Sequence, residues 1–200
     1  MADRERRGLT EPVEVREDGT GTIAGYAAMY GVETVIAGFF REQIAPGAFD
    51  SALKGDDDVR SLFNHDSNIV LGRTKSGTLR LSETKKGLRY DIDLNPEDPE
   101  ALRVRAMIKR GDISGSSFGF LVKADRWDEP QNKRDLPLRT ILEAELFDVS
   151  PVTFPAYPQT SVTARDIQDA AEARRVLDAR QVEWRHLLAA KVALAKAWPA

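Results

Sequence analysis

The sequence predicts a mostly β domain with flanking helices (an α+β class), followed by a long helix near the carboxyl end. Short apolar runs with turn signals between them recur from residue 12 to residue 94, which is typical of a barrel or sandwich rather than a parallel sheet. Helical spacing of apolar residues appears in residues 99–110 and again in residues 166–197. The content of 42% hydrophobic and 30% charged residues is that of an ordinary globular protein.

The amino-terminal half supplies most of the predicted strands. Residues 12–30 predict a hairpin, because apolar and polar residues alternate on either side of the turn signal EDGT. Residues 46–54 predict a short helix, with Pro46 near its start and Gly55 after its end. Four short strands are expected between residues 59 and 94, and glycines mark two of their turns.

The clearest predicted helix spans residues 99–110. Asp98 is suited to cap it, Pro99 fits its first position, and a glycine follows its last turn. Strands are then expected over residues 113–127 and 139–154, with a polar loop between them.

The chain is expected to divide into three parts. Residues 1–11 predict a flexible amino terminus, residues 12–158 a barrel domain, and residues 159–200 a linker with a helical tail. The sequence contains no apolar run long enough to cross a bilayer and no recognisable leader, so the expectation is a protein of the cytosol without a membrane partner.

Composition excludes several kinds of chemistry. The absence of cysteine rules out disulfides, thiol nucleophiles and cysteine-based zinc sites, and two histidines are too few for a multi-histidine metal site. We therefore expect neither a cofactor nor a metal. The net charge of −3 argues against a general nucleic-acid binder. Any chemistry has to use hydroxyls, carboxylates, lysines or an imidazole.

The strand GDISGSSFGF contains a candidate nucleophile. By strand alternation, Ser117 shares a face with Gly115 and Gly119, and we expect these glycines to leave clearance for a substrate backbone. Ser114 and Ser116 point with the phenylalanines of the other face and are poorer candidates, although neither is excluded. The alternative interpretation is a strand of small residues packed against another element.

His65, in LFNHD, is the candidate base that a serine nucleophile requires. The other histidine, His186, lies in the predicted carboxyl-terminal helix beside Trp184 and is expected to face a partner or solvent. The adjacent Asp66 would point away from His65 in a continuing strand, so a third group has to come from elsewhere.

Asp148 is the candidate third group. By alternation it continues the face of Leu142, Ala144 and Leu146, and a carboxylate on an apolar face needs a partner such as an imidazolium. Glu143 falls on the opposite face by the same count and stays the alternative, as does a solvated carboxylate at a strand end.

Five segments in a fixed order carry a family resemblance: GYAAMYG, FREQIAPGAFDSAL, LFNHD followed by LGRT, GDISGSSFGF, and LFDVSPVTFPAYP. Between Gly25 and Thr163 the chain resembles the prohead (head-maturation) protease family of tailed bacteriophages. The resemblance implies the fold of the herpesvirus assembly proteases, a closed, mostly antiparallel β-barrel ringed by helices. It also implies a serine peptidase whose histidine is His65 and whose serine is Ser117.

Two positions refine this resemblance. Ser116 stands where methionine is common in the family, which places a second hydroxyl beside the implied nucleophile. Asp148 lies where the herpesvirus enzymes have a second histidine as third member, in agreement with the count of strand faces.

The resemblance further implies a role in the host cytoplasm, inside the immature capsid. The expected substrate is the scaffolding segment of the major capsid protein or a separate scaffold protein, together with the protease itself, and the expected active form is a homo-oligomer. The alternative is a non-catalytic capsid-assembly or scaffold-associated protein, for which His65 and Ser117 would lie far apart. A nucleic-acid-binding barrel is the weaker rival, because it needs basic and aromatic residues interleaved on one face.

Overall fold

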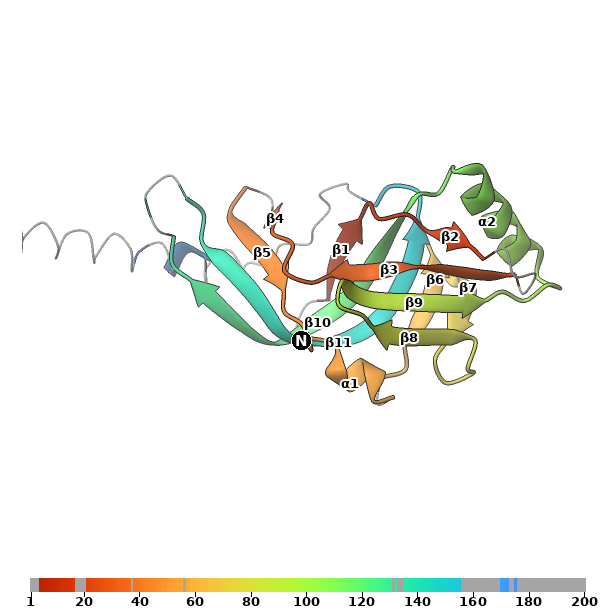
Figure 1. Ribbon diagram of the computed structural model, residues 1–200, viewed down its shortest axis with the longest axis horizontal. Helices are drawn as coiled ribbons and strands as arrows, with labels where there is room; N and C mark the ends of the chain where they lie inside the picture. Colours follow the sequence, from red (N-terminus) through yellow and green to blue (C-terminus); the bar gives the residue numbers. More distant parts are fainter. Residues whose placement is uncertain are drawn as a thin grey trace, which may run out of the picture.

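The computed structural model describes residues 4–16, 21–36, 38–55, 57–130, 132, 135–155, 170–172 and 175. This part of the chain is mostly β and forms two sheets with a few short helical segments (Figure 1). Among these residues no helix has both the length and the apolar composition needed to cross a bilayer.

The larger sheet has seven strands: β1 (Glu5–Leu9), β4 (Thr34–Ile36), β5 (Phe40–Ile44), β6 (Arg60–Phe63), β7 (Asp66–Arg73), β10 (Gly115–Asp128) and β11 (Leu138–Val152). Its main path runs β1-β10-β11-β5-β4, and β6 pairs with β11 and β7 beside this path. β10 and β11 form a long antiparallel hairpin, whereas β5 and β6 pair with β11 in parallel. β11 is therefore the central strand of the sheet.

The smaller sheet has four antiparallel strands in the order β2-β3-β9-β8: β2 (Glu14–Val15), β3 (Thr22–Met29), β9 (Gly87–Asp93) and β8 (Leu79–Glu83). β2 and β3 form the hairpin that the sequence predicts, and this prediction is confirmed.

One apolar core joins the two sheets. Ile23 and Ile92 of the smaller sheet are buried in the same cluster as Phe118 and Phe120 of β10, and Phe49 packs edge-on to Phe118 with ring centroids 5.7 Å apart. Burial of these large side chains is the main contribution to the stability of the fold. Ser116 and Phe118, on either side of Ser117 in β10, are both buried. Because successive side chains of a strand point to opposite faces, Ser117 lies on the face of β10 away from this core.

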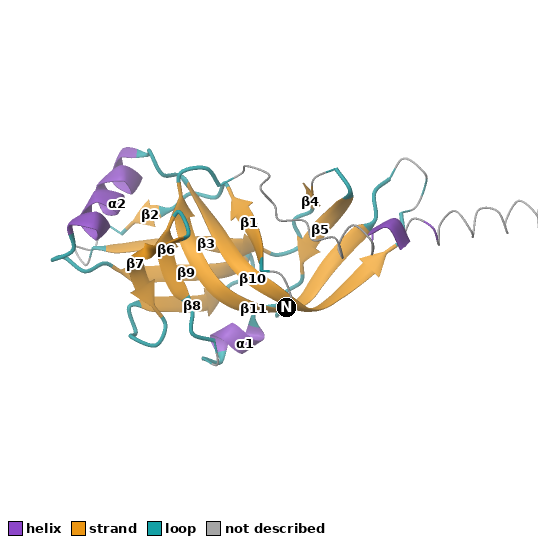
Figure 2. Cartoon of the chain, turned by 180° about the vertical axis from the view of Figure 1, so that it is seen from behind, coloured by secondary structure: helices purple, strands orange, loops and turns teal. Residues whose placement is uncertain are grey.

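The short helix α1 (Asp50–Leu53) lies near β8, and α2 (Pro99–Arg110) covers one end of the sheets (Figure 2). The bounds of α2 confirm the sequence prediction. The side chain of Asp98 accepts a hydrogen bond from the amide of Glu100, and Gly111 takes the left-handed conformation (φ 87°) that ends the helix.

The outer halves of β10 and β11 extend beyond the smaller sheet, where β5 and β4 lie beside them (Figure 1). A second, small apolar cluster forms there: Trp127 packs edge-on to Phe40 at 5.0 Å, with Ile36 and Ala170 beside it.

The predicted closed barrel is wrong. In the described part of the chain neither sheet closes on itself, since the larger ends at β1, at β4 and, on its branch, at β7, and the smaller ends at β2 and β8. Strand alternation reveals which face is buried but not which edges meet, so the sequence pattern fits open sheets as well as a barrel. Of residues 166–197, expected to form a long helix, only 170–172 and 175 are described, and these are helical; the rest lies outside the described residues, as does His186.

Candidate active site

His65 lies in a two-residue turn between β6 and β7. Phe63 pairs with Asp66 across the hairpin, which leaves Asn64 and His65 as the connecting residues, with φ angles of 53° and 60°. Two-residue hairpin turns of type I′ need positive φ at both central positions, and asparagine and histidine adopt such angles more readily than most residues. The histidine is therefore presented at the tip of a hairpin, not along a strand as the sequence suggested.

Asn64 holds this turn against the end of β11. Its backbone amide donates to the carbonyl of Pro151 (3.1 Å) and its Nδ2 to Thr153 Oγ1 (3.2 Å), while the amide of Thr153 donates to Asn64 Oδ1 (2.9 Å). Three contacts to one segment fix the strained turn, and with it the position of the neighbouring imidazole.

The three predicted site residues form a continuous hydrogen-bonded series. His65 Nε2 lies 2.7 Å from Ser117 Oγ, and His65 Nδ1 lies 2.5 Å from Asp148 Oδ1. An ionised carboxylate can only accept, so the Nδ1 proton faces Asp148 and Nε2 is left to accept from the serine. This is the tautomer that a serine–histidine pair requires for proton transfer.

Ser150 completes the environment of Asp148. Its Oγ donates to Asp148 Oδ1 at 2.7 Å, so that oxygen bonds both to Ser150 and to His65. Asp148 is only 8% exposed, and a buried carboxylate is stable only when hydrogen bonds replace its lost water. Ser150 was not singled out from the sequence, where the only signal was its place two residues after Asp148.

A pocket of about 600 Å³ opens beside the hydroxyl of Ser117 and the imidazole of His65. Its walls come from residues 6–8 at the amino terminus, from Asn64, and from residues 152–155 after β11. Ser117 is 7% exposed, so most of the residue is covered by the surrounding chain. The pocket is large enough to receive a few residues of a peptide.

The structure separates Ser117 from its neighbours in sequence. Ser116 is fully buried on the core side, where its hydroxyl lies 2.7 Å from the phenolic oxygen of Tyr90, and burial raises the pKa of that tyrosine. Ser114 precedes β10 and is exposed. The hydroxyl within reach of the imidazole belongs to Ser117.

The glycines beside Ser117 make room for other parts of the chain, not for a substrate as expected. A Cβ on Gly119 would lie 2.3 Å from Asp148 Oδ2, and one on Gly115 would lie 2.3 Å from Pro155 Cγ. Real atoms do not approach so closely, so the absent side chains allow Asp148 to reach the imidazole and Pro155 to pack on β10.

Asp148 reaches the site through an irregularity in β11. Gly119 pairs with Asp148, but the next residue, Phe120, pairs with Leu146, which leaves Phe147 as an extra residue. Directly paired residues share a face, so Leu146 points into the core with Phe120 while Asp148 points to the site with Gly119. The predicted alternation was wrong here, because a regular strand would have turned Asp148 into the core.

Other candidates lie away from the site. Glu143 pairs opposite Ala124 and is exposed, and Leu142, predicted to share the face of Asp148, is 41% exposed. Asp66 accepts a hydrogen bond from the amide of Asn68. Within the described residues no group of histidine, aspartate and glutamate side chains is arranged to hold a metal ion.

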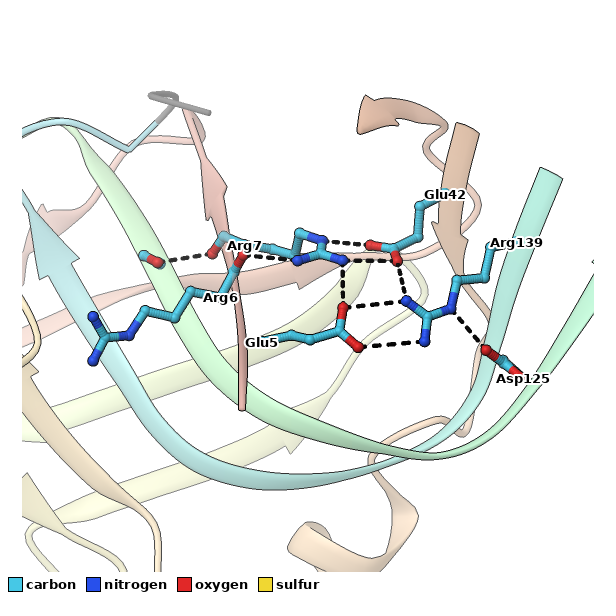
Figure 3. A network of polar contacts seen from close by, with 7 residues as sticks. Glu5, Arg6, Arg7, Glu42, Asp125 and Arg139 are labelled. Carbon is cyan, nitrogen blue, oxygen red and sulfur yellow. Dashed lines mark hydrogen bonds and ion pairs between the residues drawn. The ribbon is translucent and has the colours of Figure 1, made fainter. Parts of the chain in front are cut away.

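A buried network of charges that no sequence pattern indicated adjoins the site (Figure 3). Arg7 of β1 bonds to Glu42 of β5 (2.5 and 2.9 Å) and to Glu5 (2.5 Å), and Arg139 of β11 lies 3.2 Å from both carboxylates. Asp125 lies 2.7 Å from Arg139 on its other side. Burial alone would lower the pKa of Arg7, but Glu42 and Glu5 outweigh it and raise the pKa. The backbone of Arg7 also touches the site, since its carbonyl accepts from Ser117 Oγ at 2.8 Å.

The chain is similar in sequence to known proteins. Residues 10–173 match the family described as caudovirus prohead serine protease. The chain belongs to this family. It is 30% identical over 159 residues to the prohead protease of Enterobacteria phage HK97, a similarity that covers 78% of this chain and 64% of that relative's length. No solved structure matches the chain.

Proposed function

We propose that this protein is a serine endopeptidase in which Ser117 is the nucleophile, His65 the general base and Asp148 the group that orients the base. The observation that carries the proposal is the hydrogen-bonded series from Ser117 through His65 to Asp148, with contacts of 2.7 and 2.5 Å, beside a pocket of about 600 Å³. The series is assembled from three separate segments of the chain, which only a specific fold brings together.

The proposed mechanism begins with transfer of the Ser117 proton to His65 Nε2 as Oγ attacks the carbonyl carbon of a peptide bond. Asp148 stabilises the imidazolium that forms. The imidazolium then protonates the leaving amine, the C–N bond breaks, and an acyl-enzyme remains. Water, deprotonated by His65, attacks the ester, and the proton returns to Ser117 as the second product leaves.

The surroundings of the series support this role. Ser150 donates to Asp148, and Asn64 holds the turn that carries His65. Such supporting contacts keep a nucleophile and its base in reacting geometry, which accounts for a large share of the rate enhancement.

The proposed biological role is phage head maturation. Family membership and the relative's name, prohead protease, support a substrate in the immature head: the scaffolding segment of the major capsid protein, a separate scaffold protein, or the protease itself. We place this activity inside the immature capsid in the host cytoplasm and propose a homo-oligomer as the active form. A non-catalytic assembly protein would have no need to bring His65 within 2.7 Å of Ser117.

The test is co-expression with the neighbouring capsid or scaffold protein, followed by intact-mass analysis. The wild-type chain should produce defined fragments, and Ser117→Ala should produce none, because members of such a series act as a unit. Ser116→Ala is the matched control: it removes a hydroxyl from the same strand on the core side and should still cleave. Equal cleavage by wild type and Ser117→Ala would remove Ser117 from the mechanism.

A further inference from the structure

The amino-terminal strand β1 occupies the edge of β10 beside the nucleophile. The pairing runs from Glu5 opposite Phe120 to Leu9 opposite Ser116, which places Gly8 opposite Ser117. On the other side of β10, Ser117 pairs with Ser150 of β11. Peptides that bind to sheets do so by adding a strand to a free edge. With β1 in place, β10 has no free edge at Ser117.

β1 also engages the hydroxyl itself. Ser117 has one hydroxyl proton, and two acceptors compete for it: the carbonyl of Arg7 at 2.8 Å and His65 Nε2 at 2.7 Å. Attack requires that proton to pass to the imidazole and a substrate carbonyl carbon to stand about 3–3.5 Å from Oγ. The carbonyl of Arg7 draws the proton away from the imidazole and fills part of the space in front of Oγ. The docked strand therefore opposes the reaction.

The attachment of β1 is mainly polar. Its sequence, ERRGL, contains one apolar side chain, whereas β3 reads TIAGYAAM. The side chains of Glu5 and Arg7 are buried in the charge network, and Glu42 and Arg139 supply the partners from β5 and β11 (Figure 3). Little hydrophobic burial is lost when such a strand leaves the sheet.

If β1 leaves the sheet, the charge network separates into two groups that each contain both signs of charge. Glu5 and Arg7 depart together as an oppositely charged pair, and Glu42 stays with Arg139, 3.2 Å away. Removing one member of a buried ion pair is costly because it leaves an unpaired charge. Departure of the whole strand leaves Arg139 between Glu42 and Asp125, so each remaining charge keeps an oppositely charged neighbour. The strand is therefore held firmly while it is docked but can still exchange.

We propose that β1 is an exchangeable strand that keeps the site at rest, and that a substrate segment takes its place along the edge of β10. The inference rests on the proposed protease function of Ser117 and adds to it how the site is opened and where the substrate backbone lies. Access to Ser117 then depends on how often β1 leaves the sheet.

The test uses the full chain with Arg7→Gln. This substitution removes the guanidinium that Glu5 and Glu42 share, which disfavours the docked strand and leaves the undocked state unaffected. Arg7→Lys, which keeps the charge but loses the two-pronged contact with Glu42, is a milder second variant. Arg41→Gln is the matched control, because Arg41 lies on the same strand as Glu42 but pairs with Glu33 outside the network.

Two measurements are made on each variant: hydrogen exchange of the backbone amides of residues 5–9, and the rate at which a fluorophosphonate probe labels Ser117. In Arg7→Gln both should rise by roughly tenfold or more, since loss of a buried ion-pair partner strongly disfavours the docked state. Arg7→Lys should show a smaller rise in both, and Arg41→Gln should behave as wild type.

The outcomes separate the two proposals. Unchanged exchange of residues 5–9 in both Arg7 variants would overturn the exchangeable strand, and so would faster exchange with unchanged or slower labelling. If the amides of residues 5–9 exchange faster but the probe labels Ser117 in no variant, the proposed protease function is overturned. The proposed role of β1 in restraining that function is then overturned as well. Arg7→Gln combined with Ser117→Ala has to abolish labelling, which shows that the probe reports on Ser117.

Discussion

Gly119→Ala tests whether the space beside Ser117 serves Asp148. The new Cβ would lie 2.3 Å from Asp148 Oδ2 and 3.3 Å from its Cγ, while an ordinary carbon–oxygen contact is about 3.3 Å or more. The carboxylate therefore has to move by roughly 1 Å, and its other oxygen is held by His65 and Ser150. A displacement of about 1 Å at a catalytic group costs roughly 100-fold in rate, or about 2.7 kcal/mol of activation free energy.

The assay is kcat for cleavage of the capsid or scaffold substrate, with thermal unfolding measured on the same sample. We expect kcat of Gly119→Ala to fall roughly 100-fold while the protein stays folded. If the alanine acts through Asp148, adding Asp148→Asn to it should cost little more than Asp148→Asn alone, because the two changes remove the same interaction. Full activity of Gly119→Ala, or losses that multiply in the double variant, would refute the reasoning.

Two further predictions concern the hairpin that carries His65. Asn64→Ala should lower the free energy of unfolding by about 1–2 kcal/mol and reduce kcat, because alanine is strained at a φ of 53° and the contacts to Thr153 are lost. Glycine tolerates that φ angle. In a thermal melt Asn64→Gly should therefore recover part of the stability, but it should not recover the activity. Asp58→Asn should lower the unfolding temperature at neutral pH, because its hydrogen bond to Arg73 lowers the pKa of Asp58 from 3.8 to about 2. A depressed folded-state pKa gives stability that is present above pH 3.8 and lost as the pH falls towards 2. The difference between wild type and Asp58→Asn should therefore shrink across that interval, and a constant difference would show that the carboxylate charge is not responsible.

The sequence predicted the elements that are determined by residues close together in the chain. The bounds of α2 follow from a capping aspartate, a proline and a terminal glycine, each of which acts within one turn. His65 and Ser117 could be singled out because the chain offers so few alternatives: it has two histidines and no cysteine. The closure of the sheets could not be predicted, since it depends on which edges meet and not on the pattern within any strand.

Asp148 lies against His65 as the sequence analysis expected, but the count that selected it was wrong. Counting faces from Leu146 assumed a regular strand, but the extra residue at Phe147 reverses the side to which Asp148 points. Such an irregularity is set by pairing with β10 and leaves no mark in β11 alone. β1 was missed for a similar reason, because Glu5 and Arg7 are stabilised by partners on β5 and β11, 35 to 134 positions away.

The spacing of the three site residues along the chain has a consequence for the timing of folding. Ser117 and His65 are 52 positions apart, and His65 and Asp148 are 83 apart. Contacts between distant positions form late, because the loops that join them must first be closed. Asp148 also lies on the central strand, which has to pair with β5, β6 and β10 before the series is complete. On the proposed mechanism, a chain still emerging from the ribosome has a serine and a histidine but no means of cutting its neighbours, and proteolytic capacity arises only with the finished fold.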